Sequence, residues 1–382
     1  MNIGIFDISF VEICLVAGLV AAFIYEIYFY IRYIRLRRGG KPGEDKQSPR
    51  NAQPPVSVIV CARNEGYNLQ AYIQSLLTQD YPEYEVIIVN DGSEDKTQAV
   101  IDDYVISDPR VRTTFVPKGA RVKSTKKLGL TLAIKAAKYD FILLTDADCR
   151  PESRSWISAV MDGFHANQRE IAIVLGFGAY FNEPTLLNGV IQYETLFNGL
   201  HYLGAAVAGK PYMGVGRNLA YRKSAFFEHG GFSDQMTEFA GDDDLLVNRI
   251  ATKTNTAVVT SPESITWSVP KRTWKSWWQQ KRRHLSVSHA YRPATKRHLL
   301  REPLARALFY GIIIALFVLG EPLSLCVAFG LLIVRLLVQC IILNSAAKRL
   351  GLPAIGLELL WYDICLPVVT LVAMCGKKRS KW

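Results

Sequence analysis

The sequence predicts an α/β domain inserted between membrane-spanning helices at the two ends of the chain. Three observations support this: both ends contain long apolar segments, strand and helix patterns alternate between them, and polar motifs directly follow the strands. The chain has 382 residues, of which 49% are hydrophobic and 21% charged. This composition excludes a disordered polyelectrolyte, a collagen-like repeat and a small disulfide-rich scaffold.

The first apolar segment, residues 8–31, is long enough to cross a bilayer as one helix, which takes about 20 residues. A cleaved signal peptide would need basic residues before its apolar segment, and none precedes this one. Basic residues follow it instead: Arg32, Arg35, Arg37, Arg38 and Lys41. We therefore expect an uncleaved anchor, with the domain after it on the cytoplasmic side of the membrane.

Two further spans are expected near the other end, at residues 304–320 and 323–343, separated by a tight break at Glu321-Pro322. The second contains Arg335, which costs about 2.5–3.5 kcal/mol at a helix centre, less than its many apolar neighbours contribute at about 0.3–0.6 kcal/mol each. Arg335 should therefore face protein or reach for the membrane surface.

Residues 355–375 form a third candidate span, which Glu358, Asp363 and Pro367 weaken. As a full span it would place the basic tail outside, against the usual distribution of positive charge. An interfacial or re-entrant segment is the alternative. The expected regions are thus an anchor and basic linker (1–50), a cytoplasmic domain ending in an interfacial helix (51–300), and a membrane region of two or three segments (301–382).

Within the middle region, strand-like runs occur at residues 56–60, 85–89 and 141–144, with helical stretches between them. The runs end in Cys-Ala-Arg-Asn-Glu, Asn-Asp-Gly-Ser and Thr-Asp-Ala-Asp. Strands that alternate with helices predict a parallel sheet, with ligands bound at the carboxyl ends of the strands. All three polar motifs lie at such ends.

Asp146 and Asp148 are the most specific local signal, because carboxylates need a divalent ion to hold a diphosphate beside them. Mg²⁺ or Mn²⁺ suits one or two carboxylates together with phosphate oxygens. A surface Asp-x-Asp loop is the plain alternative. Two other motifs also have a plain structural alternative. Asp91, in its Asn-Asp-Gly-Ser motif, could simply cap a turn. The pair Lys126-Lys127 could simply lie on a solvated helix face.

Two later segments carry concentrated charge. The carboxylates of residues 242–244 are crowded, which raises at least one pKa and suits a general base, although an acidic helix start would look the same. Trp274, Trp277 and Trp278 precede the basic run at residues 279–284. This predicts either an interfacial helix or a cationic lid over a diphosphate.

In this order the motifs resemble the membrane-bound family 2 glycosyltransferases of GT-A (Rossmann-like) fold, over residues 55–292. The flanking layout is similar to that of ceramide glucosyltransferases and polysaccharide synthases. The resemblance implies that Asn64, Glu65 and Asp91 hold the nucleoside. It also places Lys126, with Lys127 as its alternative, near the nucleotide-sugar phosphates. Asp146 would contact nucleotide or sugar, and Asp148 would ligate the metal.

The resemblance also implies a catalytic base. The family motif Glu-Asp-x-Asp-Leu, aligned at its end, makes Asp242 the base and puts Gly241 at the usual Glu. A shift of one residue would make Asp243 the base. The family motif Gln-x-x-Arg-Trp matches at two catalytic positions, Gln280 and Arg283. At the third position, where the family's Trp usually helps to form the acceptor platform, this chain has His284.

The implied function is inverting, metal-dependent transfer from a nucleotide-sugar, expected to be a UDP-sugar, to a membrane lipid or lipid-linked hydroxyl. A processive polysaccharide synthase and an inactive membrane scaffold are the alternatives. The net charge of +11 alone would also fit nucleic-acid binding. We expect no nucleic-acid partner, because the charge lies beside apolar spans and in the basic run, where anionic lipid and diphosphate explain it.

Overall fold

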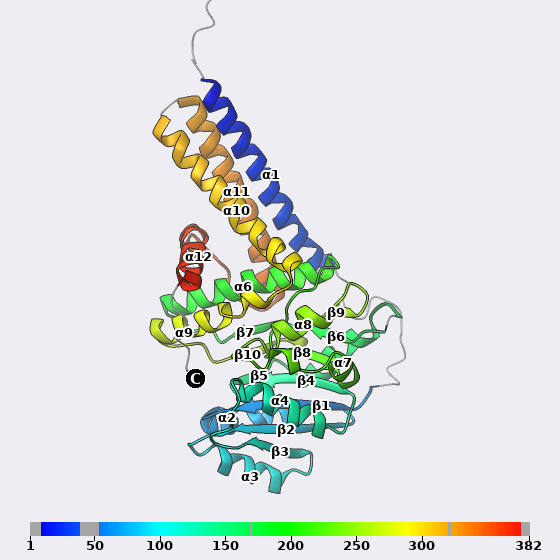
Figure 1. The fold of residues 1–382 in the computed structure, drawn as a ribbon. Coiled ribbons are helices and arrows are strands. Elements are labelled where there is room, and N and C mark those ends of the chain that lie inside the picture. The colour runs from blue at the N-terminus through cyan, green and yellow to red at the C-terminus, as the bar shows by residue number, and fades with distance from the viewer. Residues whose placement is uncertain (1–8, 39–52, 169, 320–321, 376–382) are drawn as a thin grey trace, which may run out of the picture.

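The computed structural model describes residues 9–38, 53–168, 170–319 and 322–375. An α/β domain carries the sheets, and three long helices project from it side by side (Figure 1). The basic tail after residue 375, most of the expected linker, and Gly320 and Glu321 at the expected break lie outside the described residues.

The main sheet has seven strands in the order β3-β2-β1-β4-β8-β6-β9. Their bounds are β1 (Val56–Ala62), β2 (Tyr84–Asp91), β3 (Val111–Val116), β4 (Phe141–Asp146), β6 (Ile173–Leu175), β8 (Leu219–Arg222) and β9 (Thr256–Val258). The first four strands run parallel, and Cys61 of β1 lies opposite both Val89 and Asp146. The carboxyl ends of β2, β1 and β4 therefore meet at one edge, as the sequence predicts.

Helices cover both faces of this sheet because successive side chains of a strand point to opposite faces. Val58 and Val60 pack with α2 (Gly66–Leu77), α3 (Thr97–Ser107) and α5 (Trp156–Met161). Ile59 faces the other side, toward α4 (Thr125–Ala136), α6 (Leu186–Val207) and α8 (Asp244–Ile250). Burial on both faces accounts for the unbroken apolar runs that identified these strands.

Shorter elements complete the domain. A second sheet joins β5 (Cys149–Pro151), β10 (Thr266–Ser268) and β7 (Gly178–Tyr180), in that order. The remaining helices of the domain are α7 (Lys223–Glu228), α9 (Trp274–Leu285) and the 3-10 helices Asp162–Gln168, Ser233–Gln235, Pro262–Ser264 and Ser288–Ala290. Because β5 begins directly after the Asp146 motif, the second sheet continues from the edge where the polar motifs lie.

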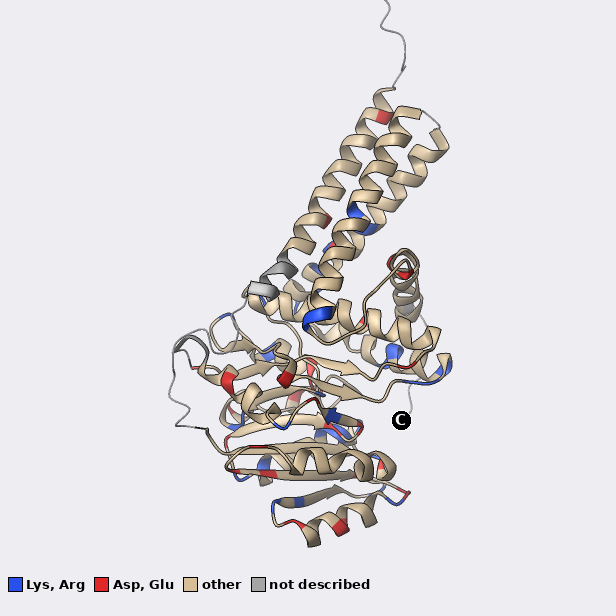
Figure 2. Ribbon diagram, turned by 180° about the vertical axis from the view of Figure 1, so that it is seen from behind, with Lys and Arg blue, Asp and Glu red and all other residues tan. Residues whose placement is uncertain are grey.

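Three helices of the described chain are long and apolar enough to cross a membrane: α1 (Phe10–Arg38), α10 (Pro293–Leu319) and α11 (Pro322–Arg349). Figure 2 shows that charged residues are sparse along the parts of these helices that lie away from the α/β domain. Leu19, Phe309, Leu316 and Ala328 are buried together between the three helices. Helix α10 begins before the boundary expected at residue 300 and continues across it.

The last helix, α12 (Glu358–Cys375), takes another direction. Figures 1 and 2 both show it almost end-on, whereas the three long helices are seen along their length. It contacts α9, α6 and α11. Residues 355–375 thus contain a helix that lies crosswise at the base of the bundle, beside the α/β domain.

Candidate active site

The loops after β1 and β2 are joined by their own polar groups. Asn64 adopts a left-handed backbone conformation (φ 56°), which asparagine tolerates better than most residues. Its backbone N–H donates to Ser93 Oγ at 3.0 Å, and its Oδ1 accepts from the backbone N–H of Glu94 at 2.8 Å. Asn64 therefore ties the two strand ends together.

Glu65 and Asp91 lie at the same edge. Burial, together with the charge of Asp148, raises the pKa of Glu65, whose Oε2 accepts from Asn68 Nδ2 at 2.5 Å. Asp91 is buried at the end of β2, and Thr125 Oγ1 donates to its Oδ2 at 2.8 Å. Arg63 forms a longer ion pair with Asp91, at 3.8 Å. The sequence reasoning missed Thr125 and Arg63, although Thr125 precedes the Lys126-Lys127 pair and Arg63 lies within the Cys-Ala-Arg-Asn-Glu motif.

Lys126 connects the two acidic motifs. Its Nζ lies 3.2 Å from Asp146 Oδ1 and 2.9 Å from Asp242 Oδ2, although 96 residues separate the two carboxylates in the chain. Burial would lower the pKa of Lys126, but the charges of Asp146 and Asp242 outweigh it and raise that pKa well above its ordinary value. The lysine is therefore held in its charged form between these groups.

Lys127 points elsewhere, and within the described residues the hydrogen bonds of its Nζ go to main-chain carbonyl groups. Its Nζ donates to the carbonyl oxygens of Gln235, Glu238 and Ala240, at 2.8, 3.1 and 2.7 Å. Burial lowers the pKa of Lys127. Of the lysine doublet, Lys126 lies among the carboxylates and Lys127 fastens the segment that leads into residues 242–244.

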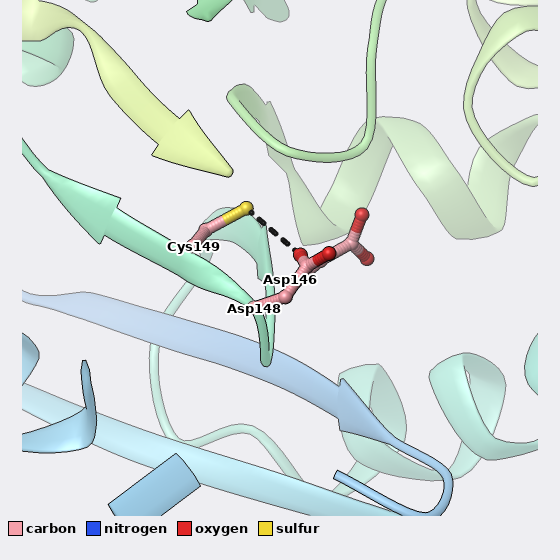
Figure 3. Close-up of side chains that lie close together, drawn as sticks. All are labelled: Asp146, Asp148 and Cys149. Carbon is pink, nitrogen blue, oxygen red and sulfur yellow. Dashed lines mark hydrogen bonds between the residues drawn. The ribbon is translucent and has the colours of Figure 1, made fainter. Parts of the chain in front are cut away.

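Asp146, Asp148 and Cys149 form a group in which the candidate ligand atoms all lie within 4.8 Å of one another (Figure 3). The two carboxylates are hard oxygen donors that fit Mg²⁺ or Mn²⁺. The thiol is a soft ligand, which fits such an ion poorly, and burial and the charge of Asp148 raise the pKa of Cys149 well above its ordinary value. Cys149 instead lies 3.5 Å from Asp148 Oδ1, as a hydrogen-bond donor, and 2.9 Å from Ser268 Oγ.

The three consecutive aspartates have different surroundings. Burial would raise the pKa of Asp242, but its ion pair with Lys126 outweighs this and lowers it. Burial and the charge of Asp242 raise the pKa of Asp243, which is the least buried of the three. Its oxygens accept backbone N–H groups of Gly216 (2.7 Å) and Asp244 (2.8 Å). Those bonds fix its orientation.

Asp244 and Gly241 frame this pair. Burial and the charge of Asp243 raise the pKa of Asp244 to about 7, and Tyr291 donates its O–H to Asp244 Oδ2 at 2.7 Å. Gly241 has φ +84°, a conformation that a side chain there would strain. A glutamate is thus disfavoured at this position, which weakens the alignment of the family's Glu with Gly241.

Helix α9 carries the two matching residues of the Gln-x-x-Arg motif. Gln280 Nε2 donates to the hydroxyl of Tyr180 at 3.2 Å, and the guanidinium of Arg217 stacks on the Tyr180 ring at 4.1 Å. Arg217 Nη1 also donates to Ser268 Oγ at 3.3 Å. Because Ser268 contacts Cys149, a chain of contacts runs from Asp148 to Gln280. Neither Tyr180 nor Arg217 is among the site residues that the sequence predicts.

The other side of α9 is fastened to α6. Lys281 pairs with Glu194, which also accepts a hydrogen bond from Trp277 Nε1 at 3.2 Å. Arg283 is half-buried. The side chain of His284 is exposed, and the positive charges of Arg283, Arg217 and Lys126 lower its pKa. These charges favour the neutral imidazole in the residue that replaces the family's Trp.

The fold is shared with a solved structure of 20% sequence identity, titled a mannosyltransferase, PcManGT, from Pyrobaculum calidifontis in complex with GDP-Man and Mn²⁺. The similarity covers 95% of this chain and 96% of that chain, with a TM-score of 0.56. It supports the expected GT-A fold between apolar helices.

Curated relatives match mainly the α/β domain. A probable glycosyltransferase of Bacillus subtilis, YdaM, is 27% identical over 237 residues, which cover 60% of this chain and 54% of the relative. A poly-beta-1,6-N-acetyl-D-glucosamine synthase of Staphylococcus epidermidis is 25% identical over 237 residues, covering 61% and 54%. The chain thus spans about half the length of these relatives.

One family profile extends far beyond the α/β domain. The profile described as Glycosyl transferase family 21 matches residues 14–379, which include the three long apolar helices as well as the sheets. This agrees with the expected resemblance to glycosyltransferases of the family 2 type. The chain belongs to glycosyl transferase family 21.

Proposed function

We propose that this protein transfers a sugar, with inversion, from a nucleotide-sugar to a hydroxyl of a membrane lipid or lipid-linked acceptor. The observation that carries the proposal is the double ion pair of Lys126 with Asp146 and Asp242. It brings a cation suited to phosphate, the Asp-x-Asp motif and the acidic triplet into one charged cluster at the edge where parallel sheets bind ligands.

Asp146 and Asp148 would hold the divalent ion. Mg²⁺ or Mn²⁺ would neutralise charge on the diphosphate as the bond to the sugar breaks. Cys149, as a neutral thiol donor, keeps Asp148 oriented. Asn64, Glu65 and Asp91 line the neighbouring strand ends, where they would bind the nucleoside.

The sequence favoured Asp242 as the base, with Asp243 as the alternative, and we now propose Asp243. Its raised pKa and its partial exposure suit a proton acceptor, whereas Asp242 is buried and committed to Lys126. The left-handed conformation of Gly241 also supports the shift by one residue. Each oxygen of Asp243 keeps a second lone pair beyond the N–H group that it accepts.

In the proposed reaction, Asp243 takes the proton of the acceptor hydroxyl while that oxygen attacks the anomeric carbon. The bond between this carbon and the diphosphate oxygen breaks, and its electron pair leaves with the nucleoside diphosphate. Lys126 and Arg283 stabilise the departing charge. Gln280, held by Tyr180, would position the acceptor.

The acceptor is the finer part of the proposal. A lipid is supported by the filled centre of the three-helix bundle, where Leu19, Phe309 and Leu316 are buried against one another. The imidazole of His284 at the platform position gives no aromatic surface of tryptophan size for a long glucan. Processive polymer synthesis remains the second candidate, which the poly-N-acetylglucosamine synthase relatives favour.

For the whole chain we propose three membrane spans and a catalytic domain on the cytoplasmic side. The three long apolar helices support the spans, and the basic residues after the first span support the orientation. The regions 1–50, 51–300 and 301–382 then correspond to anchor, catalytic domain and membrane region, with α10 shared between the last two.

The test is release of nucleoside diphosphate by the detergent-purified full chain. UDP- and GDP-sugars are supplied with Mn²⁺ or Mg²⁺, with and without extracted membrane lipids. We expect one donor to turn over only when lipid is present, and mass spectrometry to find the sugar on a lipid. A growing polymer made without lipid would favour the synthase, and an absence of turnover with every donor would contradict both.

A further inference from the structure

We propose that α12 lies in the membrane surface with its outer face against lipid, and that Asp363 holds it there by pairing with arginines of two membrane helices. This rests on the proposed membrane insertion but goes beyond the transfer reaction. It assigns a lipid-contacting surface to residues 357–374 and a positioning role to Asp363. In the sequence, this carboxylate counted against a membrane span at residues 355–375.

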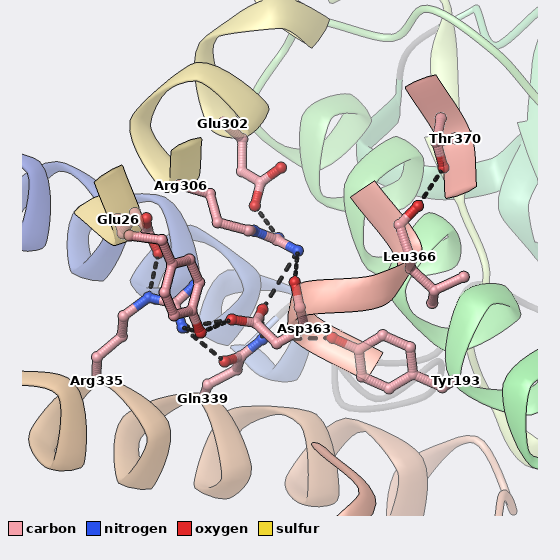
Figure 4. Close-up of polar contacts among 10 residues, drawn as sticks. Glu26, Tyr193, Glu302, Arg306, Arg335, Gln339, Asp363, Leu366 and Thr370 are labelled. Carbon is pink, nitrogen blue, oxygen red and sulfur yellow. Dashed lines mark hydrogen bonds and ion pairs between the residues drawn. The ribbon is translucent and has the colours of Figure 1, made fainter. Parts of the chain in front are cut away.

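Asp363 is a fully buried carboxylate that receives groups from both α10 and α11 (Figure 4). Arg335 Nη1 lies 2.6 Å from its Oδ2, and Arg306 Nη1 lies 3.2 Å from its Oδ1. Tyr310 O–H donates to Oδ2 at 2.6 Å, and Gln339 Nε2 donates to Oδ1 at 2.8 Å. Four polar groups of the bundle thus converge on one residue of α12.

The bundle does not need Asp363 to neutralise its arginines. Arg335 also pairs with Glu26 of α1, at 2.5 Å, and Arg306 pairs with Glu302 one turn earlier on α10. Each arginine therefore has a carboxylate within the bundle, and Asp363 is a third acid that α12 contributes. A buried carboxylate that left these partners would lose both ion pairs and hydrogen bonds. Asp363 consequently fixes α12 against the two helices.

The opposite face of α12 is an apolar stripe without a partner in the described chain. Trp361 and Ile364 are 63% and 51% exposed. The stripe begins at Leu357, just before the helix, and recurs at helical spacing through Leu360, Trp361, Ile364, Val368, Leu371, Val372 and Met374. An exposed stripe of this length marks an interaction surface.

Lipid is the occupant that fits this stripe. Neighbouring α11, which contacts α12, presents the same kind of surface, with Ile333, Leu337 and Ile341 all exposed. Because α12 runs crosswise to the spanning helices at their domain end, it would lie parallel to the bilayer plane (Figures 1 and 2). Trp361 suits that layer, where tryptophan is enriched.

The position of α12 affects the proposed active site through α9, because α12 packs against α9. Helix α9 carries Gln280 and Arg283, so a surface helix held at a fixed depth sets the height of these residues above the lipid. An acceptor with a lipid tail could then remain in the bilayer while its hydroxyl enters the site.

The depth of α12 can be measured on the full chain in phospholipid nanodiscs. A nitroxide is attached at Ile364→Cys or Val368→Cys in a background with the native cysteines replaced, and its collisions with oxygen and with a water-soluble nickel complex are compared. We expect both labels about 5–10 Å below the headgroup boundary. Ile106→Cys on α3 provides the water-exposed control and Ile314→Cys on α10 the deep control, since both side chains are well exposed.

A label as accessible to nickel as Ile106→Cys would overturn the proposal, and so would one as deep as Ile314→Cys. Exclusion of both reagents would show that protein covers the stripe, which also contradicts it. None of these outcomes depends on enzymatic activity, so the proposed transfer reaction is tested separately.

The role of Asp363 is tested by repeating the measurement with Asp363→Asn. The ion pairs Glu26–Arg335 and Glu302–Arg306 remain in this variant, so the bundle should persist while the label at Ile364 changes depth and gains mobility. Glu358→Gln, on the same helix but exposed, is the matched control and should change nothing. Asp363→Glu keeps the charge and should restore most of the native signal. An unchanged depth and mobility in Asp363→Asn would remove the positioning role.

Discussion

At the residue scale, Asp242 and Asp243 can be separated by isosteric substitution. Asp243→Asn removes the proposed proton acceptor and should slow transfer about a hundredfold or more while donor binding is retained. Asp242→Asn releases Lys126, so its main effect should be weaker binding of nucleoside diphosphate. Single-turnover transfer and calorimetric binding with Mn²⁺ measure the two effects. If Asp242→Asn alone abolishes transfer and keeps binding, Asp242 is the base.

Asp244 predicts a pH dependence of stability. Its pKa is raised to about 7 in the folded protein, against about 3.9 in an unfolded chain. Between these values the unfolded chain releases a proton that the folded protein retains, so stability falls as pH rises from about 4 to 7 and is then level.

Asp244→Asn should remove this dependence, because an amide has no proton to lose in this range. We expect the melting temperature of Asp244→Asn to lie near that of the parent at pH 4.5. At pH 8 it should lie several degrees above that of the parent. Thermal unfolding in detergent across this range measures the difference. Asp103→Asn, at an exposed position of α3, is the control. A difference that does not vary with pH would contradict the role given to Asp244.

The sequence identified the acidic residues and Lys126 because each stands in a short motif after a strand or before a helix. It could not identify the stacking of Arg217 on Tyr180, which joins residues 37 positions apart. Nothing local distinguishes this arginine from a surface one. The choice between Lys126 and Lys127 was open for a related reason: neighbouring helical residues point about 100° apart, and the sequence does not say which faces the site.

At the element scale, α4 holds the segment before the acidic triplet in place through the hydrogen bonds of Lys127. Lys127→Met leaves three carbonyl oxygens without their donor, and we expect turnover to fall about tenfold or more as residues 242–244 lose their support. Binding of nucleoside diphosphate should change little, because Lys126 is intact. Steady-state kinetics and calorimetry check this split. Lys135→Met, exposed on the same helix, should leave both unchanged.

The strands of the parallel sheet were predictable because their burial on both faces leaves continuous apolar runs, as in β1 and β2. The three-residue strands β6 and β9 carry too few residues for a periodic pattern, and they form because neighbouring strands pair with them. The direction of α12 also depends on tertiary contacts. Asp363 seemed to oppose a membrane location only because its partners, Arg306 and Arg335, lie elsewhere in the sequence.

At the scale of the whole molecule, polar contacts link the three long apolar helices to one another and to the α/β domain. Arg335 of α11 pairs with Glu26 of α1, and Gln339 of α11 donates to the hydroxyl of Tyr193 on α6 at 3.4 Å. In lipid, apolar side chains alone favour no particular helix partner, so buried polar contacts help to determine which faces meet. Of the two placements expected for Arg335, the structure shows the one that faces protein, with a carboxylate on each side of the guanidinium.

This arrangement predicts that substituting Arg335 and substituting Glu26 lower the stability of the protein by different amounts. Arg335→Gln leaves Glu26 buried without its cation and should destabilise the protein by about 3–5 kcal/mol. Glu26→Gln should cost less, because Arg335 retains Asp363. The double variant Glu26→Gln/Arg335→Gln removes the uncompensated charge and should recover part of the loss, so the two changes would not be additive. Thermal unfolding of all four proteins in nanodiscs measures the cycle. Additive losses, or equal effects of the two single changes, would mean that helix packing alone holds α1 against α11.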